Sequence, residues 1–79
     1  MPTIVSFGHG ALKFKIYARD HDPPHVHAEA GGASLRIDLL TLEPLDDRTD
    51  FSRAAVRRIM ELVRDYRDEL MEAWDELHG

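Results

Sequence analysis

Hydrophobic and polar residues alternate in three segments of the first half of the chain, residues 11–19, 25–30 and 33–40. A repeat of two residues is typical of a strand with one buried face. The apolar positions of these segments are Leu12, Phe14, Ile16, Ala18, Val26, Ala28, Ala30, Leu35, Ile37 and Leu39. The pair Gly31-Gly32 favours a tight hairpin, because glycine readily adopts the positive φ that such turns require. The pattern predicts a three-stranded antiparallel β-meander.

The last third of the chain has a helical repeat instead. Its apolar residues recur at steps of three and four, namely Val56, Ile59, Val63, Tyr66, Leu70, Ala73 and Leu77, and Met60, Met71 and Trp74 widen the stripe. This pattern predicts a long amphipathic helix over residues 53–77, with Thr49 or Ser52 as its N-cap. Such a helix is ~37 Å long, whereas an eight-residue strand spans ~26 Å. We therefore expect the helix to overhang the sheet, to break in two or to cover a second subunit.

The strands and the helix together predict a single α+β domain over residues 1–79, with the meander packed on the C-terminal helix. Residues 3–7 add a weak extended signal before the first strand. The chain has no cysteine, which excludes disulfides and thiolate zinc sites. No segment resembles a signal peptide or a membrane span, so we expect a cytoplasmic protein that does not contact membranes.

Charge is distributed unevenly along the chain. The net charge of −5 argues against tight non-specific binding to nucleic acid. The segment up to Arg36 has four basic and three acidic side chains, whereas the remainder has six basic and twelve acidic ones. A phosphate-bearing ligand is therefore expected in the N-terminal half. The charged face of the C-terminal helix is either solvated or a surface for a partner, such as a second copy of this chain in a homodimer.

A dense run of histidines and prolines lies between the first two predicted strands. Residues 21–27 contain three of the five histidines and two of the four prolines of the chain. Histidine exchanges protons near neutral pH and is the commonest metal ligand in proteins. Pro23 and Pro24 restrict the backbone, because each fixes its own φ and pushes the preceding residue out of the helical region. The run therefore holds several imidazoles on a stiff frame.

The glycine pair also predicts which residues face each other across the hairpin. If Ala30 and Ala33 flank the turn, His25 lies opposite Asp38 and His27 lies opposite Arg36, all on the polar face. The apolar residues then share the other face. A slip of one residue would bury the histidines, so this register is well specified.

For the first strand, a five-residue loop over residues 20–24 predicts the register with the second strand. The expected facing pairs are Arg19 with His25, Tyr17 with His27 and Lys15 with Glu29. Directly opposed side chains lie close enough to touch. We therefore expect two rows across the sheet, one through Tyr17, His27 and Arg36 and one through Arg19, His25 and Asp38.

Three interpretations of this polar face remain open. The first is a solvated sheet face held by cross-strand salt bridges and a hydrogen bond between His25 and Asp38. The second is cleavage of RNA without a metal, which needs a base, an acid and cations around the phosphate. The third is a metal site of His25 and His27, completed by His21 or Asp38. The spacing matches no tight zinc signature, and the basic surroundings disfavour a cation.

The second interpretation assigns a role to each residue of the face. His25 and His27 are the catalytic acid and base, and Tyr17 completes the catalytic set by stacking on a nucleobase or donating a hydrogen bond. The residues expected to bind phosphate are Arg19, Arg36 and Lys15. The supporting residues are Asp38, His21, Pro23 and Pro24. On this interpretation the protein is an endoribonuclease that uses no metal and no cofactor. The other two histidines, His9 and His78, receive no role.

Four segments carry a resemblance to a known family. They are Met1-Pro2-Thr3-Ile4, Phe14-x-Ile16-Tyr17, Asp20-His21-x-Pro23-Pro24-His25-Val26-His27 and Glu69-Leu70-x-x-x-Trp74. Together they resemble the bacterial family named domain of unknown function 4160 over nearly the whole chain. The matching motif residues are His21, Pro23, Pro24, His25 and His27, whereas Arg36 and Asp38 come from the pairing argument.

The resemblance indicates the genetic context in which such proteins occur more than it indicates a particular reaction. Members of that family are small stand-alone proteins, often encoded beside a second small protein and regarded as components of toxin–antitoxin pairs. By analogy, the resemblance favours the RNA-cleavage interpretation over a solvated sheet face, and it implies a cognate antitoxin-like partner. The alternative is a module without enzymatic activity that recognises the partner of the pair, with the acidic helix as its interface.

Overall fold

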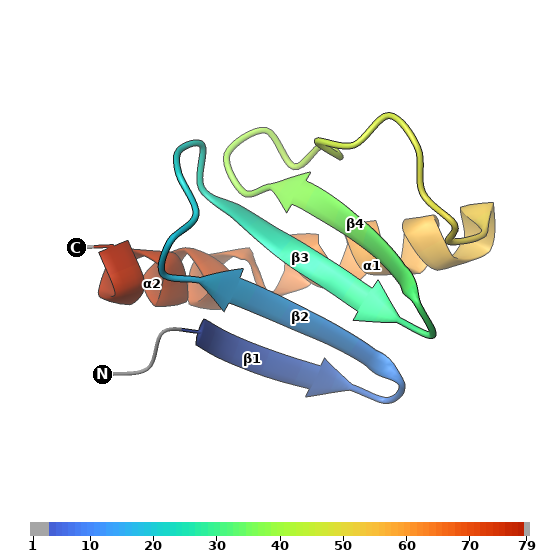
Figure 1. Ribbon diagram of the computed structural model, residues 1–79, viewed down its shortest axis with the longest axis horizontal. Coiled ribbons are helices and arrows are strands. Elements are labelled where there is room, and N and C mark those ends of the chain that lie inside the picture. Colours follow the sequence, from blue (N-terminus) through green and yellow to red (C-terminus); the bar gives the residue numbers. More distant parts are fainter. Residues whose placement is uncertain (1–3, 79) are drawn as a thin grey trace.

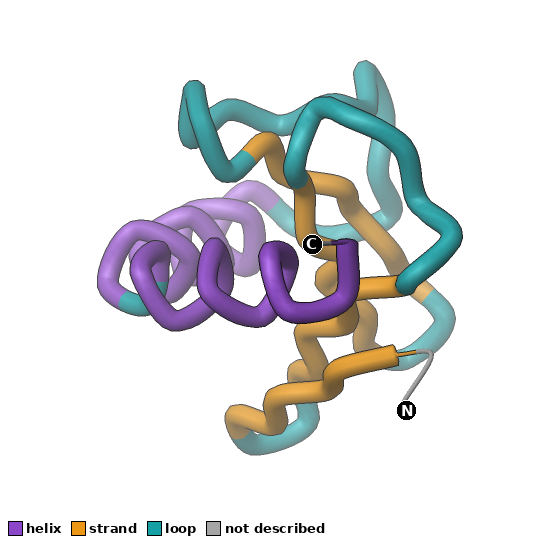
Figure 2. Tube along the Cα trace, turned by 90° about the vertical axis from the view of Figure 1, so that its left-hand side faces the viewer, coloured by secondary structure: helices purple, strands orange, loops and turns teal. Residues whose placement is uncertain are grey.

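The computed structural model describes residues 4–78 and has four strands followed by two helices. The elements are β1 (Ile4–His9), β2 (Leu12–Tyr17), β3 (His25–Ala30), β4 (Ala33–Asp38), α1 (Arg53–Asp65) and α2 (Arg67–His78). The strands form one antiparallel meander in the order β1-β2-β3-β4, and both helices cover the same face of it (Figures 1 and 2). The predicted α+β fold is confirmed. The strand β1 forms in the region of the weakly predicted extended segment 3–7, of which Thr3 lies outside the described residues.

The hairpin between β3 and β4 has the predicted register. Its facing pairs run from His25 with Asp38 to Ala30 with Ala33. The turn residues Gly31 and Gly32 have φ values of +54° and +83°. Positive φ at both central residues is typical of the two-residue turn whose twist matches that of the flanking strands.

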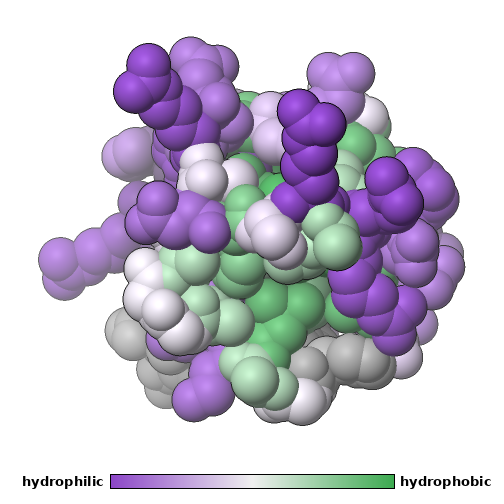
Figure 3. Space-filling view, turned by 90° about the vertical axis from the view of Figure 1, so that its right-hand side faces the viewer, coloured by the Kyte–Doolittle hydropathy of each residue, from purple (hydrophilic) through white to green (hydrophobic). Residues whose placement is uncertain are grey.

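The apolar side chains of the sheet meet those of the helices in one core. The buried set is Phe14, Ile16, Val26, Ala28, Leu35, Ile37, Leu39, Ile59, Leu62, Val63, Leu70, Ala73 and Trp74. Every buried strand position in this set belongs to the apolar half of the predicted alternation. On the end of the molecule that lies at the right of Figure 1, hydrophilic side chains flank an apolar area (Figure 3).

The predicted register between β2 and β3 is wrong by two residues. Lys15 lies opposite His27, and Lys13 lies opposite Glu29. The cause is an early end of β2 at Tyr17, where the backbone N–H of Asp20 donates to the carbonyl oxygen of Tyr17 over 3.2 Å and starts a turn. A shift by two residues keeps every side chain on its face of the sheet. The polar face therefore survives, although its facing pairs change.

The strand β4 ends at Asp38, two residues before its predicted end at residue 40. One carboxylate oxygen of Asp38 accepts the backbone N–H groups of Leu40 at 2.7 Å and Thr41 at 3.0 Å. A short side chain that binds the backbone two and three residues ahead favours a turn over a strand. The chain then returns along the outer edge of β4, where Leu45 donates its N–H to the carbonyl oxygen of Arg36 over 2.8 Å.

An ion pair fastens this returning segment to β4. The carboxylate of Asp46 accepts the backbone N–H of Arg36 at 2.8 Å, its Nε at 2.9 Å and its Nη2 at 2.7 Å. The hydrogen bonds from the Arg36 side chain hold the pKa of Asp46 below its ordinary value, against a smaller opposing effect of burial. Asp46 is therefore stabilised in its ionised form by the folded structure.

The predicted helix breaks in two, which is one of the three expected outcomes. The N-cap is Ser52, whose Oγ accepts the backbone N–H of Ala55 at 3.1 Å. Tyr66, which has φ −106° and ψ 17°, lies between the end of α1 and the start of α2. Directly after the break, the Nε of Arg67 donates to the carbonyl oxygen of Leu39 over 2.9 Å. Neither described helix is long and apolar enough to cross a membrane.

We expect the substitution Leu35→Ala to lower the free energy of unfolding by about 2–5 kcal/mol, because it leaves a cavity in the core. Leu35 is only 2% exposed. The matched control is Leu40→Ala at a position that is 56% exposed, which we expect to cost less than about 0.5 kcal/mol. Urea unfolding followed by circular dichroism measures both, and equal losses would contradict the assignment of the core.

The Asp46 ion pair predicts a pH-dependent contribution to stability. We expect Asp46→Asn to lower the free energy of unfolding by about 1 kcal/mol near neutral pH, since Arg36 is half exposed and its pairing is partly screened. A carboxylate with a lowered pKa in the folded state stabilises above its unfolded pKa of about 3.9, and this contribution is lost as the pH falls further. Urea unfolding should therefore show a constant difference down to about pH 4 and a narrowing difference below it. The control Asp47→Asn should show neither effect, and a difference that widens in acid would refute the ion pair's role.

Candidate functional site

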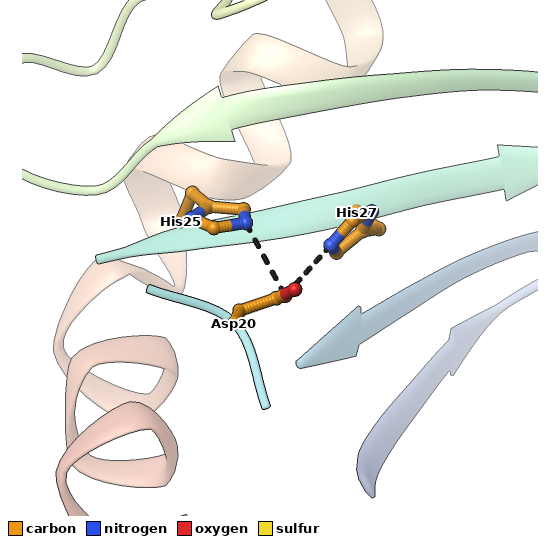
Figure 4. Close-up of side chains that lie close together, drawn as sticks. All are labelled: Asp20, His25 and His27. Atoms are coloured by element: carbon orange, nitrogen blue, oxygen red, sulfur yellow. Dashed lines mark hydrogen bonds and ion pairs between the residues drawn. The ribbon is translucent and has the colours of Figure 1, made fainter. Parts of the chain in front are cut away.

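Three side chains meet at the end of the sheet where β2 ends and β3 begins (Figure 4). His25 and His27 are alternate residues of β3 and therefore project to the same face. Asp20 lies in the loop over residues 18–24, which contains a cis peptide bond between Asp22 and Pro23. The loop returns the chain past the start of β3, so the carboxylate of Asp20 reaches both imidazoles.

One carboxylate oxygen of Asp20 faces both histidines. The distance from its Oδ2 is 2.8 Å to Nε2 of His27 and 3.2 Å to Nε2 of His25 (Figure 4). The side chain of His25 is 8% exposed, whereas those of Asp20 and His27 are 24% and 22% exposed. The site is thus closed on the side of His25 and accessible on the side of Asp20 and His27.

The other ring nitrogen of His25 determines its tautomer. Its Nδ1 lies 2.8 Å from the carbonyl oxygen of Pro23. A carbonyl oxygen only accepts hydrogen bonds, so Nδ1 carries the hydrogen. A neutral His25 then directs the lone pair of Nε2 at the carboxylate oxygen of Asp20. This contact is favourable when a proton, carried by the ring or by the carboxyl group, or a metal ion lies between the two atoms.

Aromatic rings enclose the buried side of the site. The ring of His25 lies 5.4 Å from that of Trp74, which belongs to α2, and 5.2 Å from that of His27. Tyr17 meets His27 edge to face, with 4.8 Å between ring centroids. These contacts hold both imidazoles in fixed orientations, since packed rings leave few alternative rotamers.

His78, which received no role from its sequence position, ties the end of α2 to the site. Its ring stacks on Trp74 with 3.7 Å between centroids, and its Nδ1 lies 2.8 Å from the carbonyl oxygen of Trp74. Its Nε2 lies 3.0 Å from the backbone carbonyl oxygen of Asp20. The last turn of the chain therefore supports the residue whose side chain joins the two histidines.

The predicted residues Tyr17 and Lys15 both contact Glu29 on the polar face. The hydroxyl of Tyr17 donates to Oε2 of Glu29 over 3.1 Å, and the Nζ of Lys15 lies 3.3 Å from Oε1. Burial raises the pKa of Tyr17, and the hydrogen bond to Glu29 raises it further. Tyr17 therefore stays protonated near neutral pH, and its hydroxyl donates to Glu29 in this structure.

The two predicted rows across the sheet form only in part. Tyr17 contacts His27, but the guanidinium of Arg36 opposite His27 turns to Asp46. In the other row, the carboxylate of Asp38 binds the backbone of its own turn, and His25 faces Asp20 instead. The expected hydrogen bond between His25 and Asp38 is therefore replaced by the contact with Asp20.

A cavity of about 390 Å³ opens beside the three side chains. Its lining residues are Arg19, Asp20, His21, Asp22, Pro23, His25, His27, Arg36 and Leu45. The predicted residues Arg19 and His21 are exposed there on the loop, and Pro23 contributes the carbonyl group that binds His25. Pro24 connects the loop to the end of β4, because its carbonyl oxygen accepts the backbone N–H of Leu39 at 2.9 Å.

The cluster can hold a metal ion. One ligand atom from each of Asp20, His25 and His27 lies within 4.8 Å of the other two. Two imidazole nitrogens and one carboxylate oxygen form a ligand set that zinc uses in catalytic sites, which keep one position open. The expected third ligand is His21 or Asp38, whereas the structure places Asp20 beside the two histidines.

Asp20 is the residue that the sequence argument missed. It stands at the start of the Asp20-His21-x-Pro23-Pro24-His25 run, where the alternation pattern predicts only the first residue of a loop. The two ends of a loop between antiparallel strands lie close together in space. Since His25 begins the following strand, this rule could have placed Asp20 beside it.

Comparison with known proteins gives a family without an assigned activity. No curated protein and no solved structure matches the chain. The family model described as "Domain of unknown function (DUF4160)" matches residues 12–75, which include β2, β3, the histidine–proline run and nearly all of both helices. This match covers most of the chain and includes all three residues of the candidate site. The chain therefore belongs to the DUF4160 family.

Proposed function

We propose that this protein binds a divalent transition metal ion through Asp20, His25 and His27, and that zinc is the preferred ion. The observation that carries the proposal is the hydrogen bond from Nδ1 of His25 to the carbonyl oxygen of Pro23. Metal-bound histidines nearly always donate their second ring N–H to a carbonyl or carboxylate oxygen, which fixes the tautomer and directs the lone pair at the ion. His25 has this arrangement before any ion is considered.

The spacing of the ligand atoms supports the same proposal. The Oδ2 of Asp20 lies 2.8 and 3.2 Å from the two Nε2 atoms. Ligands at 2.0–2.1 Å from a tetrahedral zinc ion are separated by about 3.3 Å. The two distances to Asp20 need to change by at most a few tenths of an ångström to admit the ion, whereas the ligand nitrogens of the two histidines, which lie within 4.8 Å of each other, need to approach each other. The accessible side of His27 and Asp20 gives the ion an entry path.

The basic surroundings, which argue against a cation in the sequence, are largely neutralised. Lys15 pairs with Glu29 over 3.3 Å, and Arg36 pairs with Asp46 over 2.7 Å. Each cation therefore has an anionic partner within contact distance, which reduces its repulsion of an ion in the site. The remaining cationic neighbour in the cavity lining is Arg19 on the exposed loop.

We expect the wild-type protein to bind one equivalent of Zn²⁺ and His27→Gln or Asp20→Asn to lose at least about tenfold in affinity. Isothermal titration calorimetry of the chelator-treated, untagged protein measures this. Because Trp74 is the single tryptophan and its ring lies 5.4 Å from His25, quenching of its fluorescence by Cu²⁺ gives a second readout at the site.

The matched control is His21→Gln, which removes an exposed imidazole of the same loop. We expect it to bind Zn²⁺ as the wild type does. Absence of zinc binding by the wild type, or an equal loss in His21→Gln and His27→Gln, would exclude the proposed ligand set.

A second candidate is the cleavage of RNA without a metal by a toxin of a toxin–antitoxin pair. The observation that favours it is the 2.8 Å contact between Asp20 and His27, since a carboxylate that orients an imidazole is typical of general bases. Tyr17 beside His27 could stack on a base, and Arg19 in the cavity lining could bind phosphate. This candidate includes a cognate antitoxin-like partner. A homodimer through the C-terminal helix is a separate proposal, which rests on the length and the charged face of that helix.

Incubation of the pure protein with RNA in excess chelator separates the two candidates. The second candidate predicts cleavage that persists in chelator and falls by about 10²–10⁴-fold in His27→Gln. Cleavage that requires added Zn²⁺ would place the activity on the metal site instead. A protein that leaves RNA intact under both conditions would rule out the second candidate.

A further inference from the structure

The open side of the proposed metal site faces a cavity whose lining has equal numbers of arginine and aspartate side chains. The charged side chains that line it are Arg19, Arg36, Asp20 and Asp22, in addition to the histidines. The two arginines are balanced by the two aspartates, and Arg36 is further neutralised by Asp46. Without an ion, the cavity therefore offers little net attraction to an anion. A bound divalent cation reverses this balance and makes the cavity positive.

The ligand count leaves a coordination position for such an anion. Three protein ligand atoms converge on the site, and a tetrahedral ion has a fourth position. The closed side is occupied by the rings of His25 and Trp74, so the free position lies toward the cavity, beside the more exposed Asp20 and His27. A volume of about 390 Å³ is large enough for a small ligand with one phosphoryl group.

Arg19 has the chemistry and the place to bind the other oxygens of that ligand. It lies one residue before Asp20, is exposed and lines the cavity. Guanidinium groups bind phosphate in a bidentate manner, which suits an anion held by a metal on its other side. Two other cations of the polar face, Lys15 and Arg36, are held by Glu29 and Asp46.

Resting on the proposed metal site, we infer that the cavity binds a phosphate group in a metal-dependent manner, with one oxygen on the ion and the others on Arg19. The class of ligand is a phosphate monoester or diester. His21, which is exposed in the same lining, is available as a further hydrogen-bond donor. The substrate class of the domain is thus phosphate-bearing, and the metal site and the phosphate site are one functional unit.

Titration of the cobalt-loaded protein with inorganic phosphate tests this inference, because the visible absorption of Co²⁺ changes when a new ligand enters its coordination sphere. We expect a saturable change in the wild type and at least about tenfold weaker phosphate binding in Arg19→Gln, with unchanged affinity for Co²⁺. The matched control is Arg64→Gln on the exposed surface of α1, which should bind phosphate as the wild type does. The chelator-treated protein should not bind phosphate in calorimetry.

The outcomes distinguish the two proposals. A wild type that fails to bind Co²⁺ overturns the metal site and this inference together. A cobalt-loaded protein whose spectrum is insensitive to phosphate overturns the inference alone. Equal weakening in Arg19→Gln and Arg64→Gln, or equal phosphate binding with and without the metal, also overturns it.

Discussion

The strand β3 imposes the constraint on which the rest of the structure depends. Its alternate residues Val26 and Ala28 are buried against the helices, while His25 and His27 project to the other face. A slip of one residue would exchange the two sets, placing imidazoles in the core and apolar groups in the site. The same burial that stabilises the fold therefore fixes the direction of both histidines.

A second constraint comes from the loop before β3. It returns the chain so that the carbonyl group of Pro23 binds Nδ1 of His25 and the carboxylate of Asp20 faces Nε2 of the same ring. The end of α2 supports the loop through the contact of His78 with the backbone of Asp20. The loop and the end of α2, which are far apart in the sequence, thus together determine the orientation of the His25 ring and the atom that its Nε2 faces.

The features that could be predicted from the sequence are those that follow from the alternation of apolar and polar residues in the strands. The three predicted strands, the pairing of His25 with Asp38 across the hairpin and the shared face of the histidines all depend on a repeat of two and on the Gly31-Gly32 turn. The break of the helix at Tyr66 was one of three outcomes that its length allowed. The strand β1 was only weakly indicated.

The rest depends on backbone geometry that a residue pattern does not contain. The register of β2 differs by two residues because a turn begins directly after Tyr17. Asp38 binds its own turn rather than His25, since its carboxylate can satisfy two backbone N–H groups there. Asp20 was missed as a site residue because a loop residue has no facing partner in a strand register.

The proposed metal site depends most on which nitrogen of the His25 ring carries the hydrogen, and long-range ¹H–¹⁵N NMR of the imidazoles in the zinc-titrated protein measures this directly. We predict that Nδ1 of His25 keeps its hydrogen throughout, while the Nε2 signals of His25 and His27 shift to the range of metal-bound nitrogen. Imidazole signals that zinc leaves unchanged, or a hydrogen found on Nε2 of His25 in the presence of zinc, would contradict the account.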